Sequence, residues 1–462
     1  MNSRREFING AGAVALMSAV CPPSFAGSAQ RRLRAGIVSD IHVRGPGWTL
    51  DPFIAALKWF DAQKVDVVAV AGDLTDFGLV EELRHVGKAW DDVFPGGRAG
   101  DGRAVEKVFV TGNHDNHFYN HAHVKKKYPD ADERFARSIA RDFDAAWREC
   151  FHEPFKPFSV KTVKGYRFVA ANYAQKGLAA FIEKNKAEFA DPSKPFFYVQ
   201  HQHLRDTCHG PMAWGRDKGE STRALSAFPN AVAFSGHSHY PLTDERAIWQ
   251  GAFTSIGTAS LKYIAPPEFC DYENGISPGK DREKEMEGLA WSRSRHLMLM
   301  DVFDDRLVIA RHALENGEFV SLGADWTIPV PFAEPPPYAF AARAGRIPAP
   351  QFAADAKIEI EFRDGVNRKK KPRRQVQLRF PEATAAGRVF DYEVKVEPLD
   401  PSRKTLTRYV LSPNFHLGKR AYASASCVFG ADELPDGCRF TVVPRSSFGR
   451  QGNPLASEVW RR

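Results

Sequence analysis

Five short apolar segments of this chain end directly in aspartate, asparagine or histidine. They are rich in valine, phenylalanine or isoleucine: "LRAGIVSD" (33–40), "VDVVAVAGD" (65–73), "KVFVTGNHD" (107–115), "KPFFYVQH" (194–201) and "AVAFSGHSH" (231–239). Apolar runs of this length are typical of buried strands, and the amphipathic segments 51–63 and 179–190 between them favour helices. We therefore expect an α/β fold in which the polar ends of neighbouring strands converge on one site.

The amino-terminal segment 1–26 has the composition of an export signal. It contains Arg4 and Arg5 near its start, then a short apolar run and small residues suited to cleavage. This arrangement is typical of a signal peptide and resembles a bacterial twin-arginine signal, which implies a periplasmic or secreted protein. Cys21 offers a lipid anchor as the alternative, but the preceding Val20 fits that motif poorly. No later stretch is long and apolar enough to be a transmembrane helix.

The length of the chain favours two domains. A chain of 462 residues exceeds what one hydrophobic core usually holds. The five segments place an α/β domain over 27–325, and seven prolines from Pro329 to Pro350 mark a linker over 326–355. Beyond it, six short strand-like segments separated by turn residues predict a small all-β sandwich of the fibronectin or immunoglobulin kind over 356–462.

The residues at the ends of the five segments form a set of metal-ligand types. The set consists of Asp40, His42, Asp73, Asn113, His201, His237 and His239. This mixture of oxygen and imidazole ligands suits Mn, Fe, Zn or Co, whereas an all-oxygen set would favour Mg or Ca. Alternate residues of an extended chain point to the same side, so the Asp-x-His and His-x-His pairs can each face one ion.

Taken in this order, the set resembles the calcineurin-like metallophosphoesterases over roughly residues 33–260. The resemblance implies a four-layer αββα sandwich with a dinuclear centre of two divalent or trivalent ions, with Mn, Fe or Zn favoured. Carried over residue by residue, one ion would be held by Asp40, His42, Asp73 and His239, and the other by Asp73, Asn113, His201 and His237. Asp73 would then bridge the two ions.

The same resemblance implies a reaction. A metal-bound hydroxide would hydrolyse a small phosphomonoester or phosphodiester, such as a nucleotide or a glycerophosphodiester, with no covalent enzyme intermediate. His114 would act as general acid at the leaving group, and Asp115 would orient its imidazole through a hydrogen bond. Purple acid phosphatases have a tyrosine three residues after the bridging aspartate; Asp76 stands there, so no tyrosinate ligand is expected.

The sequence allows two interpretations of the role of several residues near these motifs. His203 competes with His201 for one ligand position, and His201 is favoured because it directly follows the apolar segment. His117, His121 and His123 are more often a polar loop than substrate contacts. The long loops 203–228 and 262–294 carry groups that either bind the substrate or anchor the loops: His209, Trp214, Arg216, Arg223, Tyr263, Tyr272 and Trp291.

Outside the motifs, the sequence gives weaker indications of partners. The basic hairpin from Arg363 to Arg374 is most simply a solvated tip, with an anionic polymer as the alternative, and its lack of interleaved aromatics argues against nucleic acid. Cys427 and Cys438 flank a turn and are candidates for a disulfide. The rival to an enzyme is a non-catalytic scaffold acting through the β-sandwich; the presence of every ligand together with His114 argues against it.

Overall fold

The computed structural model describes residues 30–44, 49–115, 143–211, 213–265, 294–366, 371–384, 388–420 and 422–462. The predicted signal peptide lies outside the described residues, as do His117, His121, His123, Tyr272 and Trp291. Across the described part of the chain, no helix is both long and apolar enough to cross a membrane.

The first sheet has seven strands, with the amino-terminal strand β1 (Leu33–Val38) near its middle. Its order is β12-β11-β10-β1-β2-β3, and β13 pairs with β11. The other strands of this sheet are β2 (Val67–Ala71), β3 (Glu106–Val110), β10 (Arg295–Val302), β11 (Arg306–Glu315), β12 (Glu318–Ser321) and β13 (Trp326–Pro329). β1, β2 and β3 run parallel, and β10 and β11 form an antiparallel hairpin. The beginning of the segment predicted as a linker therefore belongs to this sheet as β13.

The second sheet has six strands in the order β4-β5-β6-β7-β9-β8. These are β4 (Phe158–Val163), β5 (Tyr166–Ala171), β6 (Phe196–Val199), β7 (Ala231–Ser235), β8 (Ile248–Gln250) and β9 (Thr254–Gly257). β5, β6, β7 and β9 run parallel. All five segments predicted as strands are therefore strands, and each ends shortly before its metal-ligand residue.

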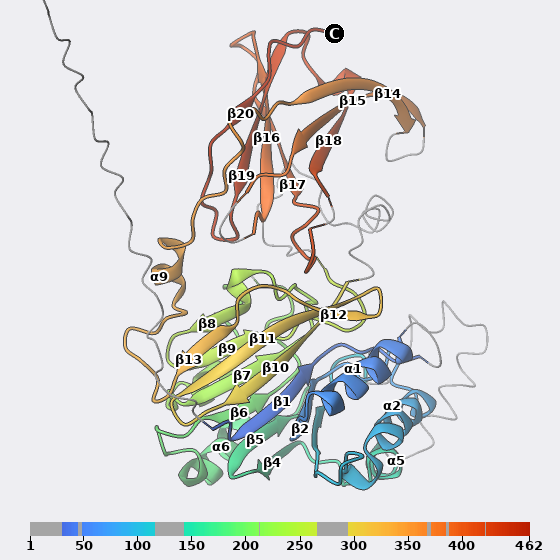
Figure 1. The fold of residues 1–462 in the computed structure, drawn as a ribbon, viewed down its shortest axis with the longest axis vertical. Helices are drawn as coiled ribbons and strands as arrows, with labels where there is room; N and C mark the ends of the chain where they lie inside the picture. The colour runs from blue at the N-terminus through green and yellow to red at the C-terminus, as the bar shows by residue number, and fades with distance from the viewer. Residues whose placement is uncertain are drawn as a thin grey trace, which may run out of the picture.

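The side chains of both sheets alternate between two cores, which places the sheets face to face. Ile37 of β1, Ala69 of β2 and Phe234 of β7 belong to one cluster between the sheets. The residues between them in sequence point outward: Val68 packs against helices of the first sheet and Ala233 against helices of the second. The outer helices are α1 (Leu50–Ala62), α2 (Val80–Val93) and α5 (Phe143–Phe151) on one side, and α6 (Leu178–Asn185) and α7 (Glu220–Leu225) on the other. This is the predicted four-layer αββα arrangement (Figure 1).

The described strands of the carboxy-terminal region form antiparallel sheets, as predicted (Figure 1). The first is β14 (Glu359–Val366), β15 (Pro372–Pro381) and β18 (Ser424–Gly430); the second is β17 (Leu406–Leu411), β16 (Asp391–Pro398), β19 (Cys438–Arg445) and β20 (Leu455–Ala456). The two sheets share one apolar cluster. Cys427 and Cys438 lie in this cluster as free, buried thiols, so the disulfide considered from the sequence is not formed. The helix α9 (Phe340–Ala344) precedes this region.

A buried histidine joins the two parts of the chain. The Nε2 atom of His296 in β10 lies 2.9 Å from the backbone oxygen of His416, and its Nδ1 atom accepts a hydrogen bond from the Leu242 amide at 3.1 Å. These partners require the neutral tautomer with its hydrogen on Nε2. Burial lowers the pKa of His296 to about 3, which agrees with a ring whose Nδ1 must stay unprotonated.

Candidate metal centre

All seven predicted ligands meet at the carboxyl ends of the parallel strands, where they form two adjoining clusters. In the first cluster, His239 Nε2 lies 3.0 Å from Asp40 Oδ1 and 3.3 Å from His42 Nε2. The three side chains are almost completely buried. They come from the chain after β1 and the chain after β7, so this cluster links the two sheets.

In the second cluster, three polar atoms surround His201 Nε2. Asn113 Oδ1 lies 2.9 Å away, His237 Nδ1 3.0 Å and Asp73 Oδ2 3.3 Å. The same Asp73 oxygen lies 3.5 Å from His42 Nε2 of the first cluster. The Asp73 carboxylate therefore lies between the two clusters.

The geometry of the clusters fits two metal ions. Ligand atoms about 2.0–2.2 Å from one ion are about 3.0–3.5 Å apart when they meet at octahedral or tetrahedral angles. Most of the spacings above fall in this range, with pairs of imidazole nitrogens facing one another. The buried Asp40 Oδ1 faces His239 Nε2 but accepts no well-directed hydrogen bond. A buried carboxylate oxygen without a hydrogen-bond donor costs folding free energy unless a cation binds to it.

The clusters form because five of their residues adopt the left-handed backbone conformation. The φ angles are 51° at Asp40, 47° at His42, 51° at Asp73, 73° at His237 and 58° at His239. Asp40 and His42 lie beyond the end of β1, so their side chains converge through this backbone and not through the extended alternation that the sequence suggested. Non-glycine residues in this conformation are uncommon and gather at functional sites.

Opposing electrostatic effects act on the clustered groups. Burial alone would raise the pKa values of Asp40 and Asp73, but His239 and His201 respectively hold them below their usual range. Burial favours neutral His201, yet the Asp73 charge outweighs it and raises the His201 pKa to about 9. Burial lowers the His237 pKa to about 3. The Asp73 carboxylate thus favours a positive charge in the second cluster, which a bound cation can supply.

Asp76 is part of the site, although the sequence suggested only the absence of a tyrosine there. Its Oδ1 atom accepts a hydrogen bond from His42 Nδ1 at 3.1 Å and lies 2.5 Å from Lys262 Nζ, and Arg44 Nε donates to Oδ2. Burial opposes the negative charge, but His42 and Lys262 keep the Asp76 pKa well below normal. A carboxylate on the far nitrogen of a ligand histidine fixes the tautomer and directs Nε2 toward the ion.

The structure corrects the predicted contact between Asp115 and His114. The Asp115 carboxylate accepts hydrogen bonds from the amides of Leu74, Thr75 and Gly112 and from the Thr75 hydroxyl, at 2.7–3.1 Å. His114 instead directs Nδ1 to the backbone oxygen of Asp76 at 2.8 Å. Burial, with the Asp73 charge adding to it, raises the Asp115 pKa to about 6. Asp115 therefore ties two loops together and does not orient the imidazole.

The two histidines of "QHQH" have separate places. The His201 ring lies in the second cluster, and its Nδ1 atom lies 3.0 Å from the backbone oxygen of Ala71. His203 lies behind the His-Ser-His loop, with its two nitrogens 2.9 Å from Ser235 Oγ and 2.5 Å from Ser238 Oγ. His203 thus contacts the residues that flank His237.

Two aromatic residues of the long loops lie beside the clusters. The Trp214 ring stacks on His237 with centroids 4.6 Å apart, and the Tyr263 ring lies 4.3 Å from that of His239. Other candidates from these loops have different positions: His209 is buried against Tyr240, and Arg223 is exposed on α7.

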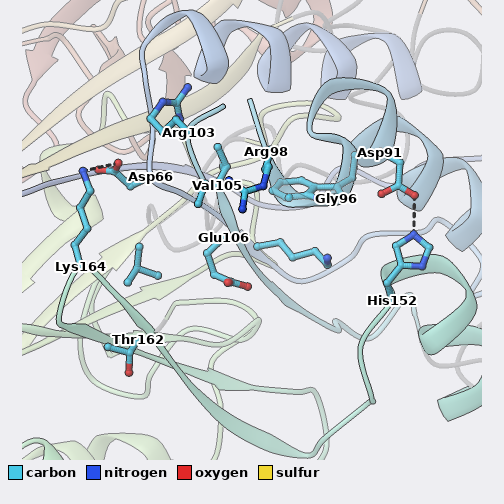
Figure 2. A pocket seen from close by; sticks show the side chains of 15 residues that line it. Asp66, Asp91, Gly96, Arg98, Arg103, Val105, Glu106, His152, Thr162 and Lys164 are labelled. Atoms are coloured by element: carbon cyan, nitrogen blue, oxygen red, sulfur yellow. Dashed lines mark hydrogen bonds and ion pairs between the residues drawn. The ribbon is translucent and has the colours of Figure 1, made fainter. Parts of the chain in front are cut away.

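One described cavity lies away from the clusters. It has a volume of about 670 Å³ and opens where β2 and β3 begin, at the opposite end from the clusters (Figure 2). Many of its charged side chains are already paired: Lys164 with Asp66 at 2.7 Å, and His152 with Asp91 at 2.9 Å (Figure 2). None of the predicted site residues lines it. Side-chain chemistry therefore identifies the candidate centre.

Several solved structures are similar to part of this chain. The chain is similar to a dimetal phosphatase from Danio rerio (12% identity, TM-score 0.37, 65% of this chain and 100% of that one). It is also similar to a purple acid phosphatase from yellow lupin (Lupinus luteus) seeds (13% identity, TM-score 0.40, 64% of this chain and 53% of that one). A third similar structure is Vps29 from Entamoeba histolytica complexed with Zn²⁺ (12% identity, TM-score 0.28, 64% of this chain and 99% of that one).

No curated protein matches the chain significantly. The model of the calcineurin-like phosphoesterase family matches residues 33–241, a range that contains all seven predicted ligands. Residues 33–241 of this chain are thus similar to a calcineurin-like phosphoesterase domain.

Proposed function

We propose that this protein is an exported, metal-dependent phosphoesterase that hydrolyses small phosphomonoesters or phosphodiesters. The observation that carries the proposal is the position of Asp73, whose buried carboxylate lies 3.3 Å from His201 and 3.5 Å from His42, between the two clusters. Two ions sharing this carboxylate would be held by Asp40, His42 and His239 on one side and by Asn113, His201 and His237 on the other.

Two bound cations would supply a water of lowered pKa and charge neutralisation for the phosphate oxygens. His114 would serve the leaving group. Its Nδ1 atom directs its hydrogen to the Asp76 oxygen, so Nε2 is the atom that can carry a proton to the departing alkoxide. Its amide also donates to Asp73 Oδ1 at 2.8 Å, which ties the position of His114 to the bridging carboxylate.

Export through the twin-arginine signal is part of the proposal and rests on the sequence of residues 1–26. Such signals carry folded proteins, which fits an enzyme whose buried metal ligands come from both sheets and assemble only on folding. The native environment would then be the periplasm or the medium.

The test combines metal content with hydrolysis. We expect about two metal ions per chain by mass spectrometry, and turnover of a chromogenic monoester or diester that a chelator abolishes and Mn, Zn or Fe restores. In variants, Asp40→Ala and Asn113→Ala should each lose one ion and Asp73→Ala both, whereas the exposed Asp191→Ala should keep both. Fewer than one ion per chain, and no turnover with any added metal, would reject the enzyme in favour of a non-catalytic scaffold.

A further inference from the structure

Two exposed aromatic rings flank the candidate centre. Among the described residues, six large apolar side chains are exposed, and four of them belong to the carboxy-terminal region. The other two are Trp214, 48% exposed, and Tyr263, 38% exposed. Each packs on a different predicted ligand histidine, Trp214 on His237 and Tyr263 on His239. Single exposed apolar residues need no explanation, but two at the rim of one polar site indicate a binding surface.

The turn that carries Trp214 is held in place. The backbone amide of Asp217 donates to the oxygen of His203 at 2.7 Å, and Arg216 Nη1 donates to the oxygen of Ala213 at 3.1 Å. Gly215 has a φ of 76°, and a Cβ there would lie 2.2 Å from His237 Cδ2, so the backbone itself contacts the ligand ring. A ring presented on an anchored turn loses little conformational entropy when a ligand stacks on it.

Tyr263 is fixed in a comparable way on the other side. Its backbone oxygen lies 3.0 Å from His239 Nδ1, and its amide donates to Ser260 Oγ at 3.3 Å. Lys262 Nζ lies 5.8 Å from the centre of the tyrosine ring while it pairs with Asp76. The backbone of Tyr263 is therefore tied to the predicted ligand histidine on which its ring packs.

We infer that Trp214 and Tyr263 form an aromatic subsite that selects phosphate esters whose alcohol part carries a planar aromatic ring, such as a nucleoside or an aryl alcohol. This inference rests on the proposed function. Indole and phenol faces bind planar rings by offset stacking, an interaction that an aliphatic alcohol such as glycerol cannot make. Glycerophosphate esters, an equal candidate from the sequence, would then be the poorer substrates.

The test compares three esters that each carry phosphate on a primary alcohol: a nucleoside 5′-monophosphate, benzyl phosphate and glycerol 3-phosphate, or their methyl diesters if diesters are preferred. We expect Trp214→Ala to lower kcat/KM for the two ring-bearing esters roughly 5- to 100-fold, the range of base–aromatic stacking, mainly through KM. Glycerol 3-phosphate should change less than about threefold, Tyr263→Ala should act in the same direction, and Trp214→Phe should retain most of the preference. The relative losses with nucleoside and benzyl esters distinguish a nucleobase from a simple aryl group.

Binding gives a readout independent of turnover. The nucleoside monophosphate should bind Trp214→Ala more weakly by calorimetry, whereas inorganic phosphate should bind it as well as the wild type. Phe362→Ala, an exposed aromatic change in β14, is the matched control and should alter neither measurement. Equal losses for all three esters together with loss of metal would overturn the inference, because the rings would then only shield the histidines. If the wild type hydrolyses all three esters equally well, the inference is overturned while the proposed function stands. If it hydrolyses none of them, both the inference and the proposed function fail.

Discussion

Gly236 lies between β7 and the predicted ligand His237, and it allows the His-Ser-His loop to approach the chain after β1. A Cβ at this position would lie 1.8 Å from Ser39 Oγ and 2.3 Å from Asp40 Oδ2. The φ angle of Gly236 is outside the left-handed region, so alanine meets no backbone strain there. The substitution Gly236→Ala therefore tests the close approach alone.

The size of the effect follows from these distances. Contacts under 3.0 Å are essentially never seen for a real Cβ, so Ser39 must move by at least about 1.2 Å, from 1.8 Å to 3.0 Å, or the loop must withdraw as far. Ser39 and Asp40 have no exposed surface, and the Ser39 hydroxyl contacts both Ala71 O and Asp40 Oδ2, so a move of Ser39 displaces the ligand carboxylate. A misplacement of about 1 Å in a catalytic site costs about 100-fold in rate, and overpacking costs about 1–3 kcal/mol of stability.

We expect Gly236→Ala to bind less than two metal ions per chain and to lose about 100-fold or more in kcat/KM on a chromogenic ester, with a lowered midpoint of thermal unfolding. Gly100→Ala is the matched control, because its Cβ would meet nothing within 4 Å and its φ is also outside the left-handed region. Circular dichroism would confirm that both variants are folded. A folded Gly236→Ala protein with two ions and the wild-type rate would refute the reasoning that links this glycine to the Asp40 ligand.

Three further predictions concern other groups. His114→Ala should keep both ions yet lose about 10²- to 10⁴-fold in turnover; a wild-type rate would exclude the proton-donor role. Asp76→Asn should weaken metal binding about 10- to 100-fold in a chelator competition, because the amide no longer holds the His42 tautomer by charge, and an unchanged affinity would contradict this. His296, with a pKa near 3 when folded and 6.5 normally, binds protons better when unfolded, so urea unfolding should show stability falling by up to about 1.4 kcal/mol per pH unit below pH 6.5. In His296→Asn, the free energy of unfolding should fall less steeply with decreasing pH. An unchanged slope would show that the His296 imidazole is not the source of this pH dependence.

The strands and the clustering of the predicted ligands could be predicted from the sequence because both depend on local patterns. A short apolar run predicts a buried strand wherever it occurs, and a polar residue at its end must lie at the edge of the sheet. The position of Asp76 could not be predicted in this way. Its partners Arg44 and Lys262 come from distant parts of the chain and meet it only when the strands are assembled.

The roles of Asp115 and Trp214 also depend on tertiary contacts. Asp115 directly follows His114 and was predicted to orient it, but the three amides of the neighbouring loops provide more hydrogen bonds than one imidazole can. Trp214 lies in a loop with no periodicity, so its stacking on His237 follows from the anchored turn around Gly215 and not from any pattern. Sequence patterns locate candidate ligands, whereas the groups that position them can be identified only from the fold.

The left-handed backbone of the ligand residues connects the motif to the fold. In both Asp40-Ile-His42 and His237-Ser-His239, the first and third residues have positive φ angles, from 47° to 73°. Aspartate and histidine are among the non-glycine residues that tolerate this conformation best, and β-branched residues tolerate it worst. The residues that can bind a metal are thus also those that can make the sharp turn at the end of the strand. One local requirement then selects the residue types for both purposes, which is why a pattern as short as Asp-x-His at the end of an apolar run can indicate the site.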